Sequence, residues 1–204
     1  YTAAVIYGLS VSHANLTHIH IAAMPAQSTT PGSPVIRHRY ARQTRATQMD
    51  IAVTDIDQTI TDCLVDASFV EGLIIADSAL HEQLLSKEHL VETVDKLGLN
   101  RRGVVTARRV ARCADGLSES GGESKARALM IERGWQTPEL QVELFDPVEP
   151  GRPYRVDYLW RVGDRLIIGE FDGFIKSEKA AEEGKLAKTQ FDERQRESRL
   201  SLLD

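Results

Sequence analysis

The sequence predicts an α/β protein with a small strand-containing region, a helical middle and a last region that mixes strands with helices. Residues 17–24 (THIHIAAM) alternate apolar and polar side chains, as a half-buried strand does. From 54 to 114 apolar residues repeat at helical spacing. Three further segments have the composition of strands, and a long charged helix is expected from about residue 177. The three segments are 139–146, 153–161 and 164–172.

The expected elements divide the chain into three regions. Residues 1–9 favour a short helix, and 31–40 (PGSPVIRHRY) favour a turn followed by a strand. The middle should contain a helix that begins near Thr54 with a capping-box-like Thr-x-x-Asp, and three more helices. Those three are expected at 69–85, 86–97 and 103–114. We therefore expect an α+β region at 1–66, a helical connecting region at 67–115 and an α/β domain at 116–204.

Composition limits the class of protein. The 204 residues are 42% hydrophobic and 27% charged, which is typical of an ordinary globular chain. No apolar run approaches the roughly 20 residues of a membrane span. Cys63 and Cys113 lie among apolar residues at helical spacing, which favours buried, reduced thiols and a cytoplasmic location.

The charge pattern and the histidine pattern each allow two interpretations, a binding site or ordinary surface residues. The net charge of −5 argues against unspecific adhesion to nucleic acid. Basic residues nevertheless cluster at 100–112, where a helical face with Arg101, Arg108 and Arg112 either contacts phosphate or is merely solvated. A strand face with two histidines, at 18 and 20, could bind metal together with the histidine at 38, but surface histidines explain them more simply.

The segment 51–62 (IAVTDIDQTITD) resembles the opening motif of haloacid-dehalogenase-type phosphatases, in which Asp55 would be the nucleophile. The helical repeat, however, begins at Ile56, inside the supposed catalytic loop. Acidic residues also suit the positive end of a helix. No β-α-β alternation surrounds the motif. We interpret it as a helix start and keep the phosphatase as a third hypothesis.

Acidic residues gather on the predicted strands of the last region. Glu170 and Asp172 are two residues apart, so in one strand both carboxylates project from the same face. Asp157, on the preceding strand of a predicted hairpin, is expected to converge on the same point. Acids at the end of a buried strand cost stability unless a cation or hydrogen-bond donors compensate. Three such carboxylates suit a hard cation such as Mg²⁺.

Asp157, a dozen residues and then Glu-x-Asp-Gly, after a helix with Gly-Glu-Ser, resemble the PD-(D/E)XK nuclease superfamily and most closely its Vsr-like (very-short-patch-repair-like) domains. The likeness covers about residues 118–204 and implies a restriction-endonuclease-like α/β/α domain with a mixed sheet. It implies that Asp157 and Glu170 hold Mg²⁺ or Mn²⁺, with Asp172 sharing the ion or orienting water. Glu123 would complete the acidic set, although Ser120-x-x-Glu123 is also a capping box.

One position departs from the superfamily pattern. A lysine is usual two residues after the second acid, where it orients water and offsets developing charge. Here that position is Asp172, as in other Vsr-like domains, and Lys176 is the candidate cation instead. Catalytic activity and a degenerate site therefore both remain open.

The first region is similar to the middle of AbiEi-type antitoxin and transcriptional-regulator proteins. The shared pattern is Val-Thr-x-x-x-x-Thr-x-x-Asp, carried here by Thr54, Thr59 and Asp62, with Gln58 in place of the usual Arg. Such proteins begin with a DNA-binding winged helix, which is not visible from Tyr1 onwards.

These patterns lead to two functional hypotheses. The first is a cytoplasmic DNA-acting protein with a PD-(D/E)XK endonuclease-like domain, which if active hydrolyses phosphodiesters with Mg²⁺. The alternative is a non-catalytic DNA-binding regulator or AbiEi-type antitoxin with a degenerate nuclease domain and a toxin as its protein partner. We expect no membrane association, and the oligomeric state stays open.

Overall fold

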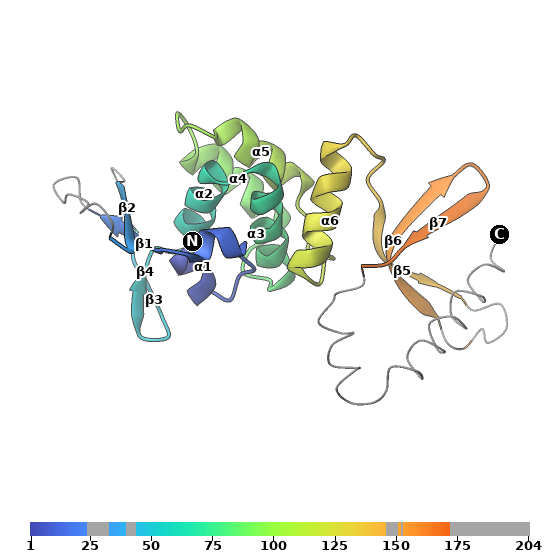
Figure 1. Ribbon diagram of the computed structural model, residues 1–204, viewed down its shortest axis with the longest axis horizontal. Coiled ribbons are helices and arrows are strands. Elements are labelled where there is room, and N and C mark those ends of the chain that lie inside the picture. The colour runs from blue at the N-terminus through green and yellow to red at the C-terminus, as the bar shows by residue number, and fades with distance from the viewer. Residues whose placement is uncertain (24–32, 40–43, 146–150, 152, 172–204) are drawn as a thin grey trace. The chain divides into compact units, whose positions relative to one another are not determined.

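A computed structural model describes residues 1–23, 33–39, 44–145, 151 and 153–171. The chain forms two compact units, residues 1–129 and 130–204, and each is described by itself (Figure 1). Helices and strands both occur among the described residues, so the predicted α/β class is confirmed. No helix in this described part is long and apolar enough to cross a bilayer.

The first unit begins with short elements. The strands β1 and β2 pair in parallel, from Ile19 opposite Val35 to Ala23 opposite Arg39, and β3 and β4 form an antiparallel hairpin. Both strands of the hairpin escaped prediction. The elements are α1 (Thr2–Ile6), the 3₁₀ helix η1 (His13–Leu16), β1 (Ile19–Ala23), β2 (Val35–Arg39), β3 (Ala46–Gln48) and β4 (Ile51–Val53).

Four helices follow, and polar side chains mark where three of them begin. They are α2 (Ile56–Asp66), α3 (Phe69–His81), α4 (Lys87–Leu97) and α5 (Val104–Cys113). Asp55 accepts a hydrogen bond from the amide of Gln58, and Ser86 accepts one from the amide of His89. Ser68 forms a full capping box with Glu71. Asp55, rather than the predicted Thr54, is therefore the residue that caps α2.

The core of this unit lies where α5 packs against α2, α3 and α4. Close approach depends on Gly72 of α3, because a Cβ there would lie 3.0 Å from Cγ2 of Val110. Large apolar side chains of all four helices are fully enclosed, and each contributes roughly 1.5–3 kcal/mol through burial. They are Ile60, Leu64, Leu73, Ile75, Leu90, Val94 and Val110.

A lysine joins two of these helices. The Nζ of Lys87, at the start of α4, donates to the carbonyl oxygen of Arg112 at 2.7 Å and to that of Ala114. These carbonyl groups lie at the end of α5, where no intrahelical donor remains for them. The ammonium group thus satisfies the end of α5 from a neighbouring helix.

Helix α6 (Gly121–Glu132) is anchored in the first unit by a buried ion pair. Nη2 of Arg127 lies 2.7 and 2.6 Å from the two carboxylate oxygens of Asp77 in α3, and Nη1 donates to the carbonyl of Cys113. The Asp77 carboxylate also accepts from the amide of Asp115. This network ties α6 to the helices of the first unit, and the structure divides after residue 129, whereas the sequence analysis began its last region at 116.

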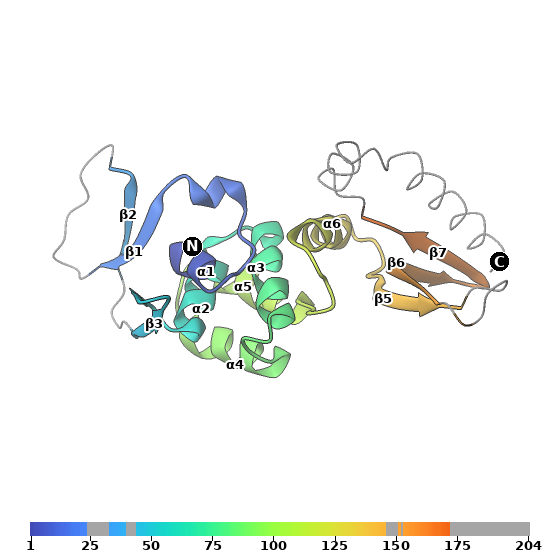
Figure 2. The ribbon, with the colours of Figure 1, turned by 90° about the horizontal axis from the view of Figure 1, so that it is seen from below.

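The second unit contains a three-stranded antiparallel sheet with β6 in the middle (Figure 2). Its strands are β5 (Glu139–Leu144), β6 (Tyr154–Val162) and β7 (Arg165–Gly169). Its core is formed by Leu144, Val156 and Leu159. All strand pairs among the described residues here are antiparallel, so the mixed sheet of a restriction-endonuclease-like domain stays a prediction. The helix expected from residue 177 lies outside the described residues.

Candidate functional site

Asp157 lies at an irregular point of the sheet. It sits in the central strand β6, one residue before the Tyr158–Gly169 pair that ends the ladder with β7. Its Oδ2 accepts a hydrogen bond of 2.8 Å from the amide of Phe171, just beyond β7. Its Oδ1 accepts a longer one, of 3.3 Å, from the side-chain amide of Gln141 in β5. The carboxylate therefore contacts residues from both sides of its strand.

The backbone of β5 is distorted opposite Asp157. The β5–β6 register pairs Leu140 with Tyr158 and Val142 with Val156, and passes over Gln141 and Asp157. Gln141 has φ +52°, in the left-handed region that costs a non-glycine residue about 1–3 kcal/mol. Such strain gathers at functional sites more often than elsewhere. Sequence patterns gave no sign of Gln141, which carries none of the usual turn signals.

Glu170 is the second acid to which the sequence assigned the metal. Strand β7 ends at Gly169, so Glu170 follows the strand instead of lying within it, and its side chain is exposed. Continuing the β6–β7 register by one residue places Glu170 opposite Asp157, and opposite residues share one face of a sheet. The observed pairs end at Gly169, so the closeness of the two acids to which the sequence assigned the metal stays a prediction that this register favours.

The other predicted site residues lie either outside the described residues or in the first unit. Asp172 and Lys176 lie outside the described residues. Glu123, in the first turn of α6, belongs to the first unit, whereas Asp157 and Glu170 belong to the second. Its carboxylate accepts from Oγ of Ser120 at 2.8 Å and from the amide of Glu119 at 2.9 Å. The capping role of Glu123 is therefore observed, and its catalytic role stays a prediction.

Carboxylate oxygens are the ligands that Mg²⁺ prefers, so the chemistry of Asp157 and Glu170 fits this ion. Within the described residues, however, no group of three or more His, Cys, Asp or Glu side chains is placed to hold a metal. Two carboxylates with water ligands still suit Mg²⁺, which usually keeps several waters. The third predicted ligand, Asp172, lies outside that part of the chain.

The first unit contains a separate polar hollow of about 600 Å³, lined by residues of β2, α2 and the segment before α5. Nη1 of Arg101 lies 2.5 Å from Oδ1 of Asp62 at its wall. Burial raises the pKa of Asp62, and Arg101 opposes that shift. Through its ion pair with Arg101, Asp62 holds the segment before α5. Asp62 is also the last residue of the AbiEi-like motif, so this position of the motif has a structural role. The lining residues are His38, Asp62, Val65, Asp66, Arg101, Arg102 and Gly103.

The rest of the AbiEi-like motif is likewise used in local structure. The hydroxyl groups of Thr54 and Thr59 lie 2.7 Å apart across the start of α2. The side-chain oxygen of Gln58 accepts from both the amide and the hydroxyl of Thr44. These contacts tie the β3–β4 hairpin region to α2.

Two histidines meet beside this hollow. Nδ1 of His20 in β1 lies 2.8 Å from Nε2 of His38 in β2, with the rings stacked at a centroid distance of 5.0 Å. The ring of Tyr1 meets His20 edge-on. Burial, reinforced by the positive charge of the amino terminus and by His38, lowers the pKa of His20 to about 4. His18 points elsewhere, to the hydroxyl of Thr17, so the three histidines do not form one cluster.

The topology of the described residues argues against the phosphatase hypothesis. Asp55 is the N-cap of α2 and its carboxylate accepts from the Gln58 amide at 2.9 Å. The strand before it, β4, has three residues and pairs only with β3 among the described residues. The nucleophile of that fold follows a parallel strand of a β-α-β unit, and no such unit surrounds Asp55 in the described first unit.

Comparison with known proteins gives two relatives. The chain is similar to Uncharacterized protein MT2308 of Mycobacterium tuberculosis (strain CDC 1551 / Oshkosh) and to Uncharacterized protein Rv2248 of M. tuberculosis (strain ATCC 25618 / H37Rv). Each is 34% identical over 101 residues, which is 50% of this chain and 35% of the relative. The chain therefore spans about a third of the length of these curated relatives. No family model and no solved structure matches it significantly.

Proposed function

We propose that the protein acts on DNA through a PD-(D/E)XK-type (Vsr-like) nuclease domain and hydrolyses phosphodiester bonds with Mg²⁺ or Mn²⁺ in the cytoplasm. The observation that carries the proposal is the position of Asp157, which reaches from the central strand to the end of β7 beside Glu170. The chain order α6, β5, β6, β7 supports it, because the resemblance calls for a helix before strands that carry the two acids.

Each residue has a defined part in this proposal. Asp157 and Glu170 bind the ion, and Asp172 shares it or orients the attacking water. The amide of Phe171 and the side chain of Gln141 fix the rotamer of Asp157, so that its carboxylate is oriented before the ion binds. The bound ion would supply Lewis-acid stabilisation of the scissile phosphate. Lys176 would offset the negative charge that develops on the scissile phosphate.

A non-catalytic regulator of the AbiEi type, with a toxin as partner, is the second candidate. The carboxylate of Glu123 is engaged by Ser120 and Glu119, which favours a structural role for one predicted catalytic acid. The place of the usual lysine is also taken by Asp172. In this reading the nuclease-like domain serves as a scaffold for DNA or for the toxin.

Plasmid nicking separates the two candidates. We expect the purified chain to nick supercoiled plasmid in the presence of millimolar Mg²⁺ or Mn²⁺. It should not nick the plasmid in EDTA, which removes the ion. Asp157→Asn and Glu170→Gln should each abolish nicking. Glu143→Gln, the same kind of change at an exposed acid on β5, is the matched control and should nick like the parent. Equal nicking by Asp157→Asn and the parent would exclude the catalytic role.

Metal titration gives an independent readout. Ion binding to the folded state raises the thermal midpoint of the unit that holds it. Millimolar Mn²⁺ should stabilise the parent and the Glu143→Gln control but leave Asp157→Asn unchanged. A parent without any such shift, together with no nicking, would support the regulator.

A further inference from the structure

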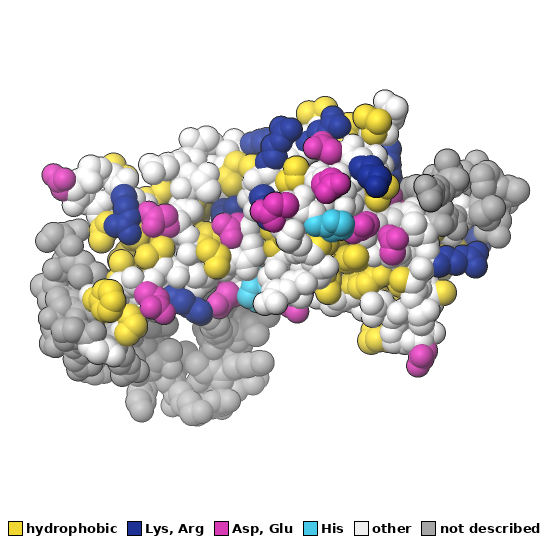
Figure 3. Space-filling model, turned by 180° about the vertical axis from the view of Figure 1, so that it is seen from behind, with side chains coloured by type: hydrophobic (Ala, Val, Ile, Leu, Met, Phe, Trp, Pro, Cys, Tyr) yellow, Lys and Arg dark blue, Asp and Glu magenta, His cyan; other side chains and the backbone are white. Residues whose placement is uncertain are grey.

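Helix α5 carries an unusual concentration of one charge. Residues 100–112 contain five arginines and no acidic residue, in a chain whose net charge is −5. A second basic stretch without acidic residues lies at 37–45, whereas basic and acidic side chains are interspersed on the face of the molecule that Figure 3 shows. The use that the fold makes of the five arginines separates them into two groups.

Two of the arginines serve the fold. Arg101 pairs with Asp62, and Nε of Arg108 lies 2.6 Å from Oδ1 of Asp95 in α4. These are two of the three residues that the sequence pattern suggested for phosphate contact. Their charges are therefore already matched within the first unit.

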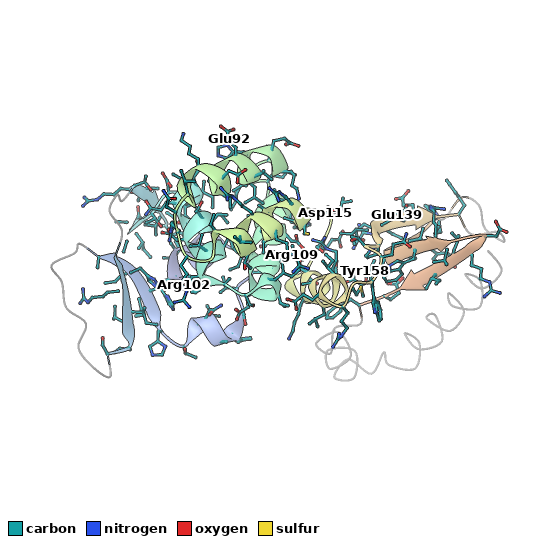
Figure 4. The ribbon with its side chains drawn as sticks, turned by 90° about the horizontal axis from the view of Figure 1, so that it is seen from above. Glu92, Arg102, Arg109, Asp115, Glu139 and Tyr158 are labelled. Atoms are coloured by element: carbon teal, nitrogen blue, oxygen red, sulfur yellow. The ribbon has the colours of Figure 1, made fainter. Side chains whose placement is uncertain are left out.

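The other three, Arg102, Arg109 and Arg112, are exposed and form what we call the α5 arginine set. Within the described part of the chain none of their guanidinium groups is paired with an acidic side chain. Arg109 instead lies over the ring of Phe69, 4.3 Å from its centroid, which limits its rotamers without neutralising it. Figure 4 labels Arg102 ahead of α5 and Arg109 farther along it.

Two members of the set share one side of α5. Val105, Arg109 and Arg112 are spaced i, i+4 and i+7, so they share one helical face, while Ala107, Val110 and Ala111 face the core. Val105 is 78% exposed at the start of this face. Arg102 precedes the N-cap Gly103, at the positive end of the helix dipole, where a cation is unfavourable. Arg112, by contrast, lies in the last turn of α5, where a cation is favourable, so helix stability accounts for Arg112 but not for Arg102.

We propose that the α5 arginine set contacts the phosphate backbone of duplex DNA. This inference rests on the proposed DNA-acting function and adds a binding surface in the first unit, outside the nuclease-like unit. Arg109 and Arg112 are about 4.5 Å apart along the axis of α5, so both can reach the same phosphate or neighbouring phosphates of one strand. Guanidinium groups bind phosphate oxygens directly and without reading base sequence. The set therefore supplies affinity and position, and no sequence specificity.

Salt dependence of DNA binding tests this inference. Each phosphate contact contributes about −0.9 to the slope of log K against log salt. Arg102→Gln/Arg109→Gln/Arg112→Gln in the full chain should therefore flatten the slope by about 2.7. Between 50 and 200 mM NaCl the parent should lose about 40-fold more affinity than this variant. The probe is a fluorescein-labelled duplex of roughly two helical turns, read by anisotropy in EDTA so that nothing is cleaved.

A charge-matched control excludes a general effect of net charge. The control variant Lys96→Gln/Arg108→Gln/Lys125→Gln also removes three positive charges from the first unit. Lys96 and Lys125 are exposed and Arg108 is paired with an acid, so this variant should keep the parent slope. Unfolding midpoints show that both variants are folded. An unchanged slope in the α5 variant, an equal fall in the control, or no binding by the parent would each overturn the inference. So would binding to phosphatidylserine vesicles as tight as binding to DNA.

The test also separates this surface from the proposed catalysis. Asp157→Asn should bind the duplex in EDTA as the parent does, because no arginine of the set is changed. A chain that binds through the set but never nicks plasmid supports this inference and refutes the nuclease. A chain that nicks but binds with an unchanged slope in the α5 variant does the reverse.

Discussion

Arg127 and Asp77 form a two-point ion pair inside the first unit, with 2% and 0% of their side chains exposed. One end of the pair lies in α6 and the other in α3, 50 residues earlier. The Cys113 carbonyl accepts from Arg127 and the Asp115 amide donates to Asp77, while Nε of Arg127 is buried without a hydrogen-bond partner among the described residues. The pair thus fixes the middle of α6 to the helical unit.

Breaking this pair should destabilise the first unit strongly. Arg127→Met leaves the Asp77 carboxylate buried without its cation, and we expect a loss of about 3–5 kcal/mol in the free energy of unfolding. Urea titration followed by circular dichroism at the helical band measures it. Arg108→Gln, at an ion pair with half-exposed partners, should cost at most about 1 kcal/mol. A similar loss in the two variants would contradict the importance of burial.

The double variant Asp77→Leu/Arg127→Met adds a second comparison. Two apolar side chains leave no uncompensated charge, so the double variant should be more stable than Arg127→Met alone. Additive losses would mean that the two side chains do not depend on each other.

Gly103 should tolerate no side chain. It adopts φ +87° as the N-cap of α5, and a Cβ there would lie 1.9 Å from the carbonyl oxygen of Val65 in α2. Gly103→Ala combines backbone strain with overlap and should cost at least about 3 kcal/mol. Gly8 has φ +84° and open space around it, so Gly8→Ala should cost only about 1–2 kcal/mol. Thermal midpoints of the two variants compare overlap with strain alone.

The protein should become less stable as the pH is lowered through the range in which the buried histidine pair resists protonation. The pKa of His20 is about 4 in the folded chain, against an ordinary value of 6.5. The unfolded chain therefore binds the extra proton first, and stability declines as pH falls from about 6.5 to about 4. His20→Gln should flatten this decline in thermal midpoints measured across that range. His13→Gln, at an exposed histidine of η1, is the control and should follow the parent curve.

The two cysteines should differ in reactivity. Burial raises the pKa of Cys63 to about 11, and its side chain is enclosed in α2. Cys113 is half-buried at the end of α5. Because the thiolate is the reacting form, N-ethylmaleimide at neutral pH should label Cys113 well before Cys63. Mass spectrometry of peptides from native and urea-unfolded protein measures this order, and equal labelling of native protein would refute it.

Helices and longer strands were predictable because their signals are local. The apolar repeat and the polar caps fall within single elements, and α2 to α5 agree with their expected ranges to within a few residues. The helix expected at 69–85 ends earlier, at His81, because Gln83 turns into the left-handed region. Apolar periodicity alone does not reveal such a turn.

The β3–β4 hairpin was not predictable for a related reason. Its strands have three residues each, and Met49 and Asp50 occupy left-handed positions without a glycine or asparagine. Hairpins with such turns usually contain Asn-Gly or Asp-Gly. The parallel pairing of β1 with β2 depends on contacts between segments and also leaves no local pattern.

The candidate sites depended on tertiary contacts in the same way. Sequence spacing identified Asp157 and Glu170, but not that Gln141 and Phe171 would hold the carboxylate of Asp157. It also grouped Arg101 and Arg108 with Arg112, because the acids that pair with the first two lie in other helices. Which charges a fold leaves unmatched becomes visible only when distant segments meet.

The side-chain amine of Lys87 connects the start of α4 to the end of α5. Acylation of that nitrogen would remove its charge and two of its donors at once, while the same chemistry on exposed Lys96 would disturb no neighbour. A small covalent modification of Lys87 would therefore weaken the packing of α4 against the end of α5.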